Sequence, residues 1–368
     1  WAAAPGALEI EQLTLRFLAG LLGLPEAGLA AHFTNGGAEA NLTAVVAALA
    51  RAFPAWADGG VRALDATPTV YLAQNAHDSL VKAVRLVGLG RQSLRSVPIT
   101  ARHELDVDAL AALVAEDRRA GCRPLLVVGT AGATSTGAID PLAALAQLAA
   151  AEDLWFHVDA AWGGAAAFSP RLRPLLEGIE RADSVVWDAH KWLAVPLAAG
   201  MFFCRHPDAL RAAFRVSADY IPPTVEHAED PFTNTVQWSR RALGLKVFMA
   251  LAELGRDGYT ALVEGQTALG DVLRARLRSA GWLVVNDAAL PVVLFTHPRM
   301  RADPTSTGRM LGAIYGRGRV LITDVTLPGG ERVLRACITS YHSDERDLDV
   351  LFEELDFALG ALASLAGR

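Results

Sequence analysis

The sequence predicts an α/β fold with a mostly parallel sheet, followed by a smaller α+β domain. Short apolar runs recur in the first part of the 368-residue chain, and helical patterns lie between several of them. Strands that alternate with helices in this way are typical of a parallel sheet covered on both faces. After about residue 245 the spacing of the runs changes, so we assign residues 1–245 to a large domain and residues 246–368 to a small one.

The elements can be predicted in order along the chain. A first helix is expected over residues 10–21, and a Gly-Gly turn at 36–37 leads into an alanine-rich helix that ends before Pro54. Strands of the large domain are predicted at 69–73, 125–130, 154–158, 184–187 and 200–204. Helices are predicted at 106–120 and 139–152. The small domain is expected to contain runs at 282–285, 291–296, 319–325 and 333–339, and a final helix from about 345.

Composition and charge exclude several classes of protein. A hydrophobic content of 52% and a charged content of 20% are ordinary for a folded chain. The net charge is −6 and no basic stripe is present, so we expect neither a nucleic-acid nor a membrane partner. The longest uncharged stretch, residues 124–139, is too short to span a bilayer. Widely spaced cysteines without a CxxC pair favour reduced thiols, a cytoplasmic protein and no metal site, at Cys122, Cys204 and Cys337.

The string WDAHKWLAVPLAAG contains the strongest chemical signal. It places Lys191 directly after His190, between two apolar strand-like runs, which is a poor position for a solvated charge. Burial lowers the pKa of a lysine, and the neutral amine is the form that attacks an aldehyde to give an imine. The alternative is a structural lysine that extends from a strand end to solvent or pairs with Asp188.

The string FHVDAAWGG supplies a candidate carboxylate. Asp159 ends an apolar run and is followed by the small residues Ala160 and Ala161. Ligands of open α/β sheets bind at the carboxyl ends of the strands, where a carboxylate can hold a pyridine nitrogen protonated and make the ring an electron sink. A helix cap or an ion pair would explain Asp159 equally well.

Three further segments have weaker signals. In HFTNGGAEAN, Gly36 and Gly37 let the backbone approach a phosphate ahead of a helix N-terminus. In NAHDSLVKA, His77 follows a strand and is suited to ring stacking or proton transfer. Thr134 lies in a loop of small residues, GTAGATSTGAIDPL, that follows another strand. A plain turn, a solvated histidine and an ordinary loop are the alternatives.

The order of these segments resembles that of the group II pyridoxal-phosphate decarboxylases, a family that includes aromatic-amino-acid, glutamate and cysteine-sulfinate decarboxylases. The HVDAAW and DAHKW strings, with 32 positions from Asp159 to Lys191, carry the resemblance, which runs from about residue 5 to the end. It implies a fold-type-I α/β fold, with a mostly parallel seven-stranded sheet in the large domain and a smaller C-terminal α+β domain. It also implies pyridoxal 5'-phosphate as cofactor and an isologous homodimer.

The resemblance implies catalytic roles for three residues, and a fourth contact with the ring. Lys191 would form the internal aldimine and later help to move protons, and Asp159 would pair with the pyridine nitrogen. His77 would stack on one face of the ring, near the substrate carboxylate, with Ala161 on the other face. The implied reaction is decarboxylation of an L-amino acid to the amine and CO2, through an external aldimine and a quinonoid intermediate.

The resemblance also implies how the phosphate is held. Backbone N–H groups and one histidine would bind it, at Gly36, Gly37, Ala38 and His190. Thr134 matches a threonine near the phenolic edge of the cofactor. Asp188 stands where some relatives carry Asn, and an ionised Asp would repel the phosphate unless a donor intervenes.

One departure from the family pattern bears on the reaction. Relatives place a tyrosine, thought to protonate the carbanion at Cα, in the loop before QWSRR. Here the loop reads AEDPFTNTVQWSRR, and the matching position falls on Phe232 or Pro231. In relatives the change from Tyr to Phe is associated with oxidative deamination to an aldehyde. Tyr220, another acid or water are the alternatives as proton donor.

A second departure leaves the substrate open. Relatives carry an N-terminal segment that helps to build the dimer and one wall of the pocket, whereas this sequence starts at Trp1, after the expected position of that segment. Trp162 is a candidate for the pocket border and suits an aromatic or apolar substrate. Arg240 is expected to have a structural or phosphate-supporting role, and Arg335 is a weaker candidate for the substrate carboxylate.

The sequence therefore favours an amino-acid decarboxylase. An aldehyde synthase, another lyase or transaminase of this fold, and an inactive cofactor-binding subunit remain alternatives. The absorption of the coenzyme separates the inactive subunit from the enzymes, and the reaction products separate the enzymes from one another.

Overall fold

The computed structural model describes residues 4–216, 230–301 and 303–366. The chain divides into two compact units. The larger unit comprises Trp1–Thr134 and Ile139–Ala261, and the smaller comprises Ser135–Ala138 and Leu262–Arg368. The division therefore falls inside one long helix, α8 (Leu243–Ser279), whose backbone is non-helical at Gly255, with φ 64° and ψ −176°.

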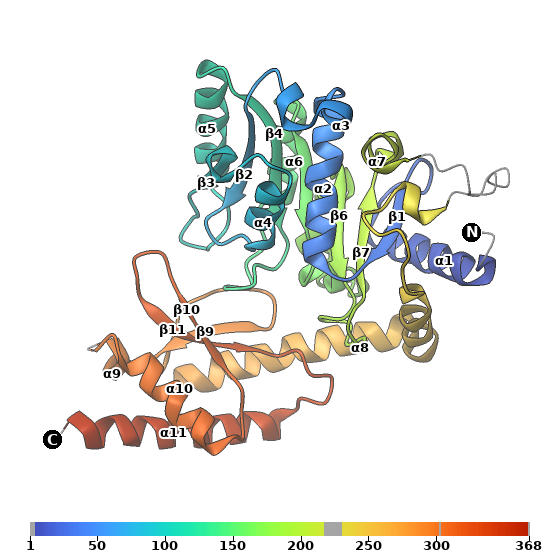
Figure 1. The fold of residues 1–368 in the computed structure, drawn as a ribbon. Helices are drawn as coiled ribbons and strands as arrows, with labels where there is room; N and C mark the ends of the chain where they lie inside the picture. Colours follow the sequence, from blue (N-terminus) through green and yellow to red (C-terminus); the bar gives the residue numbers. More distant parts are fainter. Residues whose placement is uncertain (1–3, 217–229, 302, 367–368) are drawn as a thin grey trace. The chain divides into compact units, whose positions relative to one another are not determined.

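A seven-stranded sheet organises the larger unit, in the order β1-β7-β6-β5-β4-β2-β3 (Figure 1). In chain order the strands are Ala30–Thr34, Pro68–Ala73, Leu94–Val97, Arg123–Thr130, Trp155–Asp159, Ser184–Asp188 and Gly200–Cys204. Strand β7 is antiparallel to both neighbours, β1 and β6, and the other pairs are parallel. The prediction of a mostly parallel sheet is confirmed, and the edge strands β1 and β3 are the two that the sequence did not reveal.

Helices pack on both faces of this sheet. The seven α-helices within residues 4–216 are Pro5–Leu22, Gly37–Ala52, Trp56–Gly59, Ser79–Leu86, Val107–Arg119, Leu142–Ala151 and Pro207–Phe214, labelled α1 to α7. Helix α2 (Gly37–Ala52) buries alanines against one face, together with Trp155 and Val186. Side chains alternate along a strand, so Phe156 points to the opposite face, where it lies beside Leu142 and Leu145 of α6 near Gly129. The small alanine side chains allow α2 to approach the sheet closely.

The smaller unit has its own antiparallel sheet, in the order β10-β11-β9-β8. Its strands β8 to β11 are Leu283–Val284, Val292–Thr296, Thr323–Thr326 and Arg332–Cys337. Helices α9 (Pro298–Arg301) and α10 (Ser306–Arg317) lie between β9 and β10 in the chain, and α11 (Glu345–Ala366) follows β11. A core that includes Leu277, Phe295 and Leu355 joins this sheet to its helices. The predicted α+β character of this part is confirmed, although the run at 319–325 forms a strand only from Thr323.

Three features bear on expectations from composition. Cys122, Cys204 and Cys337 are free thiols. Among the described residues, no group of three or more His, Cys, Asp or Glu side chains is arranged to hold a metal ion. Within the same ranges, no single helix is long and apolar enough to cross a bilayer. The helical segments Gly37–Ala52 and Trp56–Ala63 together have the length and composition of a membrane span, but the chain bends by 117° between them.

His32, on β1, is expected to make the stability of the fold sensitive to acid. It is buried beside Phe202, and burial, with a contribution from Arg240, lowers its pKa from 6.5 to about 3. The unfolded chain therefore binds a proton below pH 6.5 that the folded chain does not bind, so stability falls as pH falls from about 6.5 toward 3.

The predicted cost is about 1.4 kcal/mol per pH unit for this one group. Urea unfolding of the wild type and of His32→Leu at pH 4.5 to 7.5 measures the difference in slope, which removes the contributions of other titrating groups. Parallel stability curves for the two proteins would contradict the assignment.

Candidate active site

Two buried carboxylates mark the carboxyl edge of the large sheet. Asp159 ends β5 and Asp188 ends β6, and the two strands are parallel neighbours with Asp159 paired to Val186. The exposed fractions of these residues are 6% and 1%. The Asp188 N–H donates to the Ala161 carbonyl at 3.0 Å, which ties the two strand ends together. The HVDAAW and DAHKW motifs therefore meet at one edge of the sheet, where α/β folds bind ligands.

Lys191 lies beside Asp188. Its Nζ is 3.0 Å from Asp188 Oδ2, and its side chain is 34% exposed while that of Asp188 is 1% exposed. This is the ion pair that the sequence offered as the structural alternative for the lysine. It also holds the amine at the strand ends with a third of its side chain accessible, so a ligand can reach it.

The Gly-Gly turn packs closely against His190, Asp188 and Ala161. A Cβ on Gly37 would lie 3.1 Å from Asp188 Oδ2 and 3.3 Å from Ala161 Cβ, and one on Gly36 would lie 3.2 Å from His190 Cε1. The Gly37 N–H donates to Asp188 Oδ2 at 3.0 Å, so this predicted phosphate donor is directed at a carboxylate here. Asp188 Oδ1 is buried and, within the described ranges, has no hydrogen-bond partner.

The protonation of His190 follows from its contacts. Its Nδ1 accepts the Ala199 N–H at 3.0 Å, so the proton of the neutral ring lies on Nε2. Nε2 is 3.7 Å from Asp188 Oδ2. Burial lowers the pKa of His190, Asp188 opposes that effect and Lys191 adds to it. His190 is therefore a neutral donor beside the turn at Gly36.

Asp159 is held by groups that the sequence did not single out. Its Oδ1 accepts the Ala161 N–H at 3.1 Å, and its Oδ2 accepts the Asn41 side-chain amide at 3.0 Å. Asn41 also donates to Ser79 at 2.8 Å, and Ser79 contacts His77 at 2.8 Å. Asn41 and Ser79 lie inside strings that were already of interest, but the contact between α2 and β5 joins positions 118 apart, which no local pattern reveals.

The other predicted site residues have different surroundings. His77 and Thr134 are exposed, as a ligand contact requires, and Ala38 lies in the first turn of α2. The Trp162 ring stacks on buried Trp192, with centroids 4.7 Å apart and planes at 6°. Phe232, in the helical turn Pro231–Thr233, stacks on Trp238 at 4.7 Å. Tyr220 lies outside the described residues.

The two arginine candidates have different surroundings. Arg240 forms a buried ion pair with Glu11 of α1, whose two carboxylate oxygens accept from the guanidinium, so its contacts support the structural alternative. Arg335 lies on β11 of the smaller unit, and its Nε is buried without a partner among the residues described.

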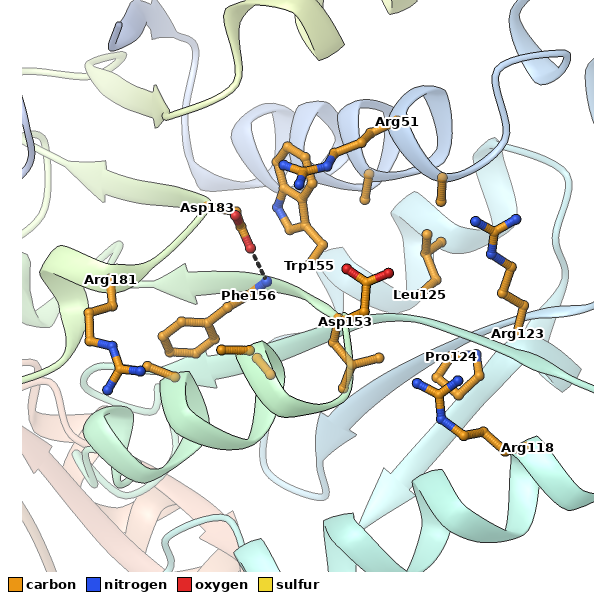
Figure 2. A pocket seen from close by; sticks show the side chains of 16 residues that line it. Arg51, Arg118, Arg123, Pro124, Leu125, Asp153, Trp155, Phe156, Arg181 and Asp183 are labelled. Atoms are coloured by element: carbon orange, nitrogen blue, oxygen red, sulfur yellow. Dashed lines mark hydrogen bonds between the residues drawn. The ribbon is translucent and has the colours of Figure 1, made fainter. Parts of the chain in front are cut away.

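A cavity elsewhere on the larger unit must be distinguished from this site. It has a volume of about 350 Å³ and lies at the amino ends of β4 and β5, the edge opposite to Asp159 (Figure 2). Arginines surround it, but Arg118 is paired with Glu152, and Arg51 contacts the His206 ring. None of the predicted site residues lines this cavity.

The residues at the carboxyl edge fit pyridoxal phosphate. The strand-end carboxylate Asp159 suits a protonated pyridine nitrogen, the amine of Lys191 suits an aldehyde, and the glycines at 36 and 37 expose backbone N–H groups at the start of α2 that suit a phosphate. Bound coenzyme would have to replace two contacts present here, the Lys191–Asp188 ion pair and the hydrogen bond from the Gly37 N–H to Asp188.

Comparison with known proteins agrees with this geometry. Residues 1–297 match the pyridoxal-dependent decarboxylase conserved domain. L-2,4-diaminobutyrate decarboxylase of Rhizobium meliloti is 36% identical over 341 residues, which cover 89% of this chain and 66% of the relative. Aromatic-L-amino-acid decarboxylase of Bacillus atrophaeus is 30% identical over 348 residues, covering 92% and 70%. The chain thus spans about two thirds of the length of these relatives.

Comparison of the fold with solved structures agrees with the sequence comparison. The crystal structure of Oryza sativa TDC with PLP and tryptamine has a TM-score of 0.92 at 27% identity, and the match covers 98% of this chain and 78% of that one. Mouse CSAD has a TM-score of 0.91 at 28% identity, covering 96% and 76%. Motifs, fold and relatives agree: the chain belongs to the group II pyridoxal-phosphate-dependent amino-acid decarboxylases, a family of carboxy-lyases.

Proposed function

We propose that this chain removes the α-carboxyl group of an L-amino acid, giving the amine and CO2, with pyridoxal phosphate bound at the carboxyl ends of β5 and β6. The observation that carries the proposal is the accessible amine of Lys191 beside the buried carboxylate of Asp188, at the sheet edge where Asp159 ends the neighbouring strand. When bound, the coenzyme supplies an aldehyde for amines and a ring that accepts the electron pair left at Cα.

Asp159 keeps the ring nitrogen protonated. Its carboxylate is buried and already receives donors from Ala161 and Asn41, so its orientation is fixed before the coenzyme binds. A preorganised charge of this kind costs no reorganisation during the reaction. The negative charge opposite the nitrogen is what favours electron withdrawal from Cα.

Lys191 and Asp188 handle protons at the amine. Nζ must lose a proton to act as a nucleophile, and Asp188 Oδ2, 3.0 Å away, is the atom that can accept it. Before the coenzyme binds, Asp188 also receives the Gly37 N–H, which holds the turn against β6. His77 is exposed at the same edge and is proposed to contact the ring face and the substrate carboxylate.

A second function shares every one of these residues. The loop position where relatives have tyrosine falls on Phe232 or Pro231, and neither side chain has a phenol; the ring of Phe232 stacks on Trp238. An unprotonated Cα can react with oxygen. The amino acid, O2 and water would then give the aldehyde, CO2, ammonia and hydrogen peroxide. This aldehyde-synthase reaction is the alternative, and an inactive coenzyme-binding subunit is the third.

Product analysis tests these proposals. The purified protein, loaded with pyridoxal phosphate, is incubated with aromatic, acidic and basic L-amino acids, 2,4-diaminobutyrate included, in air and under anoxia. Mass spectrometry is expected to detect an amine from at least one substrate, in equal yield with and without oxygen. Aldehyde with peroxide in air alone would favour the alternative, and the absence of any product from a protein that binds the coenzyme would favour the inactive subunit.

Two further proposals concern the assembly and location. A homodimer with two-fold symmetry is proposed for the active protein, in keeping with the family. Sedimentation equilibrium of the coenzyme-loaded protein is expected to give twice the 39.0 kDa chain mass. A mass equal to one chain in an active preparation would contradict the proposal. The cytoplasmic location stays a prediction.

A further inference from the structure

A continuous chain of buried hydrogen bonds centres on Asn41. The side-chain amide of Asn41 contacts Asp159 Oδ2 at 3.0 Å, Ser79 Oγ at 2.8 Å and His157 Nε2 at 2.9 Å. Ser79 continues to His77 Nδ1, and His157 Nδ1 continues to Ser184 Oγ, both at 2.8 Å. The network joins helices α2 and α4 to strands β5 and β6.

The direction of each bond near Asp159 can be derived. A carboxylate only accepts, so the Asn41 atom that faces Asp159 is the amide nitrogen, and the amide oxygen faces His157 Nε2. That oxygen also only accepts, so Nε2 of His157 carries the proton. His157 Nδ1 therefore accepts the Ser184 hydroxyl, whose oxygen accepts the Trp155 N–H at 2.8 Å.

The branch toward His77 is determined in the same way. Ser79 Oγ accepts the second N–H of Asn41, so its single hydrogen is directed at His77 Nδ1. The backbone N–H of Ser79 also donates to His77 Nδ1, at 3.2 Å, and a backbone N–H is a donor without ambiguity. The proton of the neutral His77 ring therefore lies on Nε2, the atom left available to a ligand.

Burial makes this network costly to disturb. Asn41 is 1% exposed and His157 is 0% exposed. Burial lowers the pKa of His157 to about 4, although Asp159 attracts a proton to it, so the ring is neutral at physiological pH. Loss of the Asn41 amide would leave Asp159 Oδ2 and His157 Nε2 without this buried partner, whereas Ser79 would keep its contact with His77.

We infer that Asn41 is a positioning residue of the proposed decarboxylation: its one amide orients the Asp159 carboxylate toward the ring nitrogen and, through the Ser79 hydroxyl, acts with the Ser79 backbone N–H to keep the proton of His77 on Nε2. The inference rests on the proposed function for its catalytic consequence, but the arrangement of protons is a property of the coenzyme-free chain. Asp159 ends β5 and His77 precedes α4, so the side chain of Asn41 on α2 is what links the two residues.

Two variants and one control separate this role from a general structural one. Asn41→Leu removes every contact, whereas Asn41→Asp keeps the acceptor toward His157 and loses both donors. Thr43→Val, two positions along α2, removes a buried hydroxyl that donates to the Glu39 carbonyl at 2.9 Å and lies outside the network. Circular dichroism of all three verifies the fold, and Asn41→Asp keeps the inference testable should Asn41→Leu not fold.

The first readout needs no coenzyme. Long-range 1H–15N correlation spectra of histidine-labelled, coenzyme-free protein are expected to show His77 and His157 with the proton on Nε2. The Asn41→Asp change is expected to shift the signals of both histidines, whereas Thr43→Val leaves them unchanged. A proton on Nδ1 of His157 in the wild type would overturn the inference, whether or not the protein is a decarboxylase.

The second readout is the pH profile of the loaded enzyme with a substrate identified from the amino-acid panel. At neutral pH, kcat of Asn41→Asp is expected to fall about 10- to 100-fold, as for other residues that orient a functional group, with KM changed less than about threefold. Two carboxyls that face each other share a proton, and the introduced carboxyl, once protonated, can donate to Asp159 as the amide did. Activity of this variant should therefore recover as the pH falls, relative to the wild type.

The outcomes are distinguishable. A profile of Asn41→Asp parallel to that of the wild type, or an equal loss of kcat in Thr43→Val, would overturn the positioning role. A wild type without any decarboxylase activity would overturn the proposed function alone, because the histidine spectra still decide the arrangement of protons.

Discussion

Replacing Lys191 by alanine is expected to lower kcat for decarboxylation by at least about 10⁴-fold, because the variant has no amine that can bond to the coenzyme aldehyde or return a proton. The side chain is 34% exposed, so the loss of packing is small. The loss of its ion pair leaves Asp188 with the Gly37 N–H as a donor, which limits the effect on the fold. Rates are measured by release of CO2 at saturating coenzyme.

Two matched variants isolate the amine. Lys191→Arg keeps a positive charge beside Asp188 but provides no nucleophile at neutral pH, so it should be as inactive as the alanine variant. Lys82→Ala removes an exposed lysine of α4 and should retain full activity. Activity of Lys191→Arg within about tenfold of the wild type would show that the charge, and not covalent chemistry, is what position 191 contributes.

Replacing Asp159 by asparagine is expected to lower kcat on the order of 10²- to 10³-fold, the cost of losing a preorganised electrostatic contact. The amide is nearly isosteric and can still accept from Asn41 through its oxygen. However, it has no charge to hold the ring nitrogen protonated, and its NH2 group favours the unprotonated nitrogen. The absorption spectrum of the loaded variant and its rate of CO2 release measure the effect together.

Asp153→Asn is the matched control for this change. Asp153 is exposed near the opposite end of β5 and has a positive φ of 48°, a conformation that asparagine tolerates well. It should have wild-type activity and stability. Equal activity of Asp159→Asn and the wild type would contradict the pairing of Asp159 with the ring nitrogen.

Much of the fold could be predicted because its central elements have strong local patterns. The run at 125–130 and the strand-end motif at Asp159 are apolar, β-rich and bounded by turns, and they became β4 and β5. The edge strands β1 and β3 have few large apolar residues and contain polar ones, in AAHFT and LRSV, so no periodicity marks them. The reversed direction of β7 depends on its pairing with β1 and β6, which is not encoded within the strand itself.

The candidate site was predictable as segments but not as contacts. The motifs singled out Asp159 at a strand end and Lys191 between two apolar runs, and the pairing of β5 with β6 brings the two segments to one edge. Asn41 lies in an alanine-rich helix, at the same helical spacing as the buried residues of that helix, so the sequence did not mark it as a site residue. Only the packing of α2 on β5 brings it to Asp159. In the same way, the Gly37 N–H was expected at a phosphate, and its bond to Asp188 depends on a contact 151 positions away.

The attachment of the coenzyme to Lys191 can be measured directly. The chain contains three lysines, Lys82, Lys191 and Lys246, so borohydride reduction of the coenzyme-saturated protein, followed by proteolysis and mass spectrometry, gives an unambiguous map. We expect the reduced coenzyme on the peptide that contains Lys191, and on neither of the other two. A label on Lys82 or Lys246 with Lys191 unmodified, or no label on protein saturated with coenzyme, would contradict the active site described above.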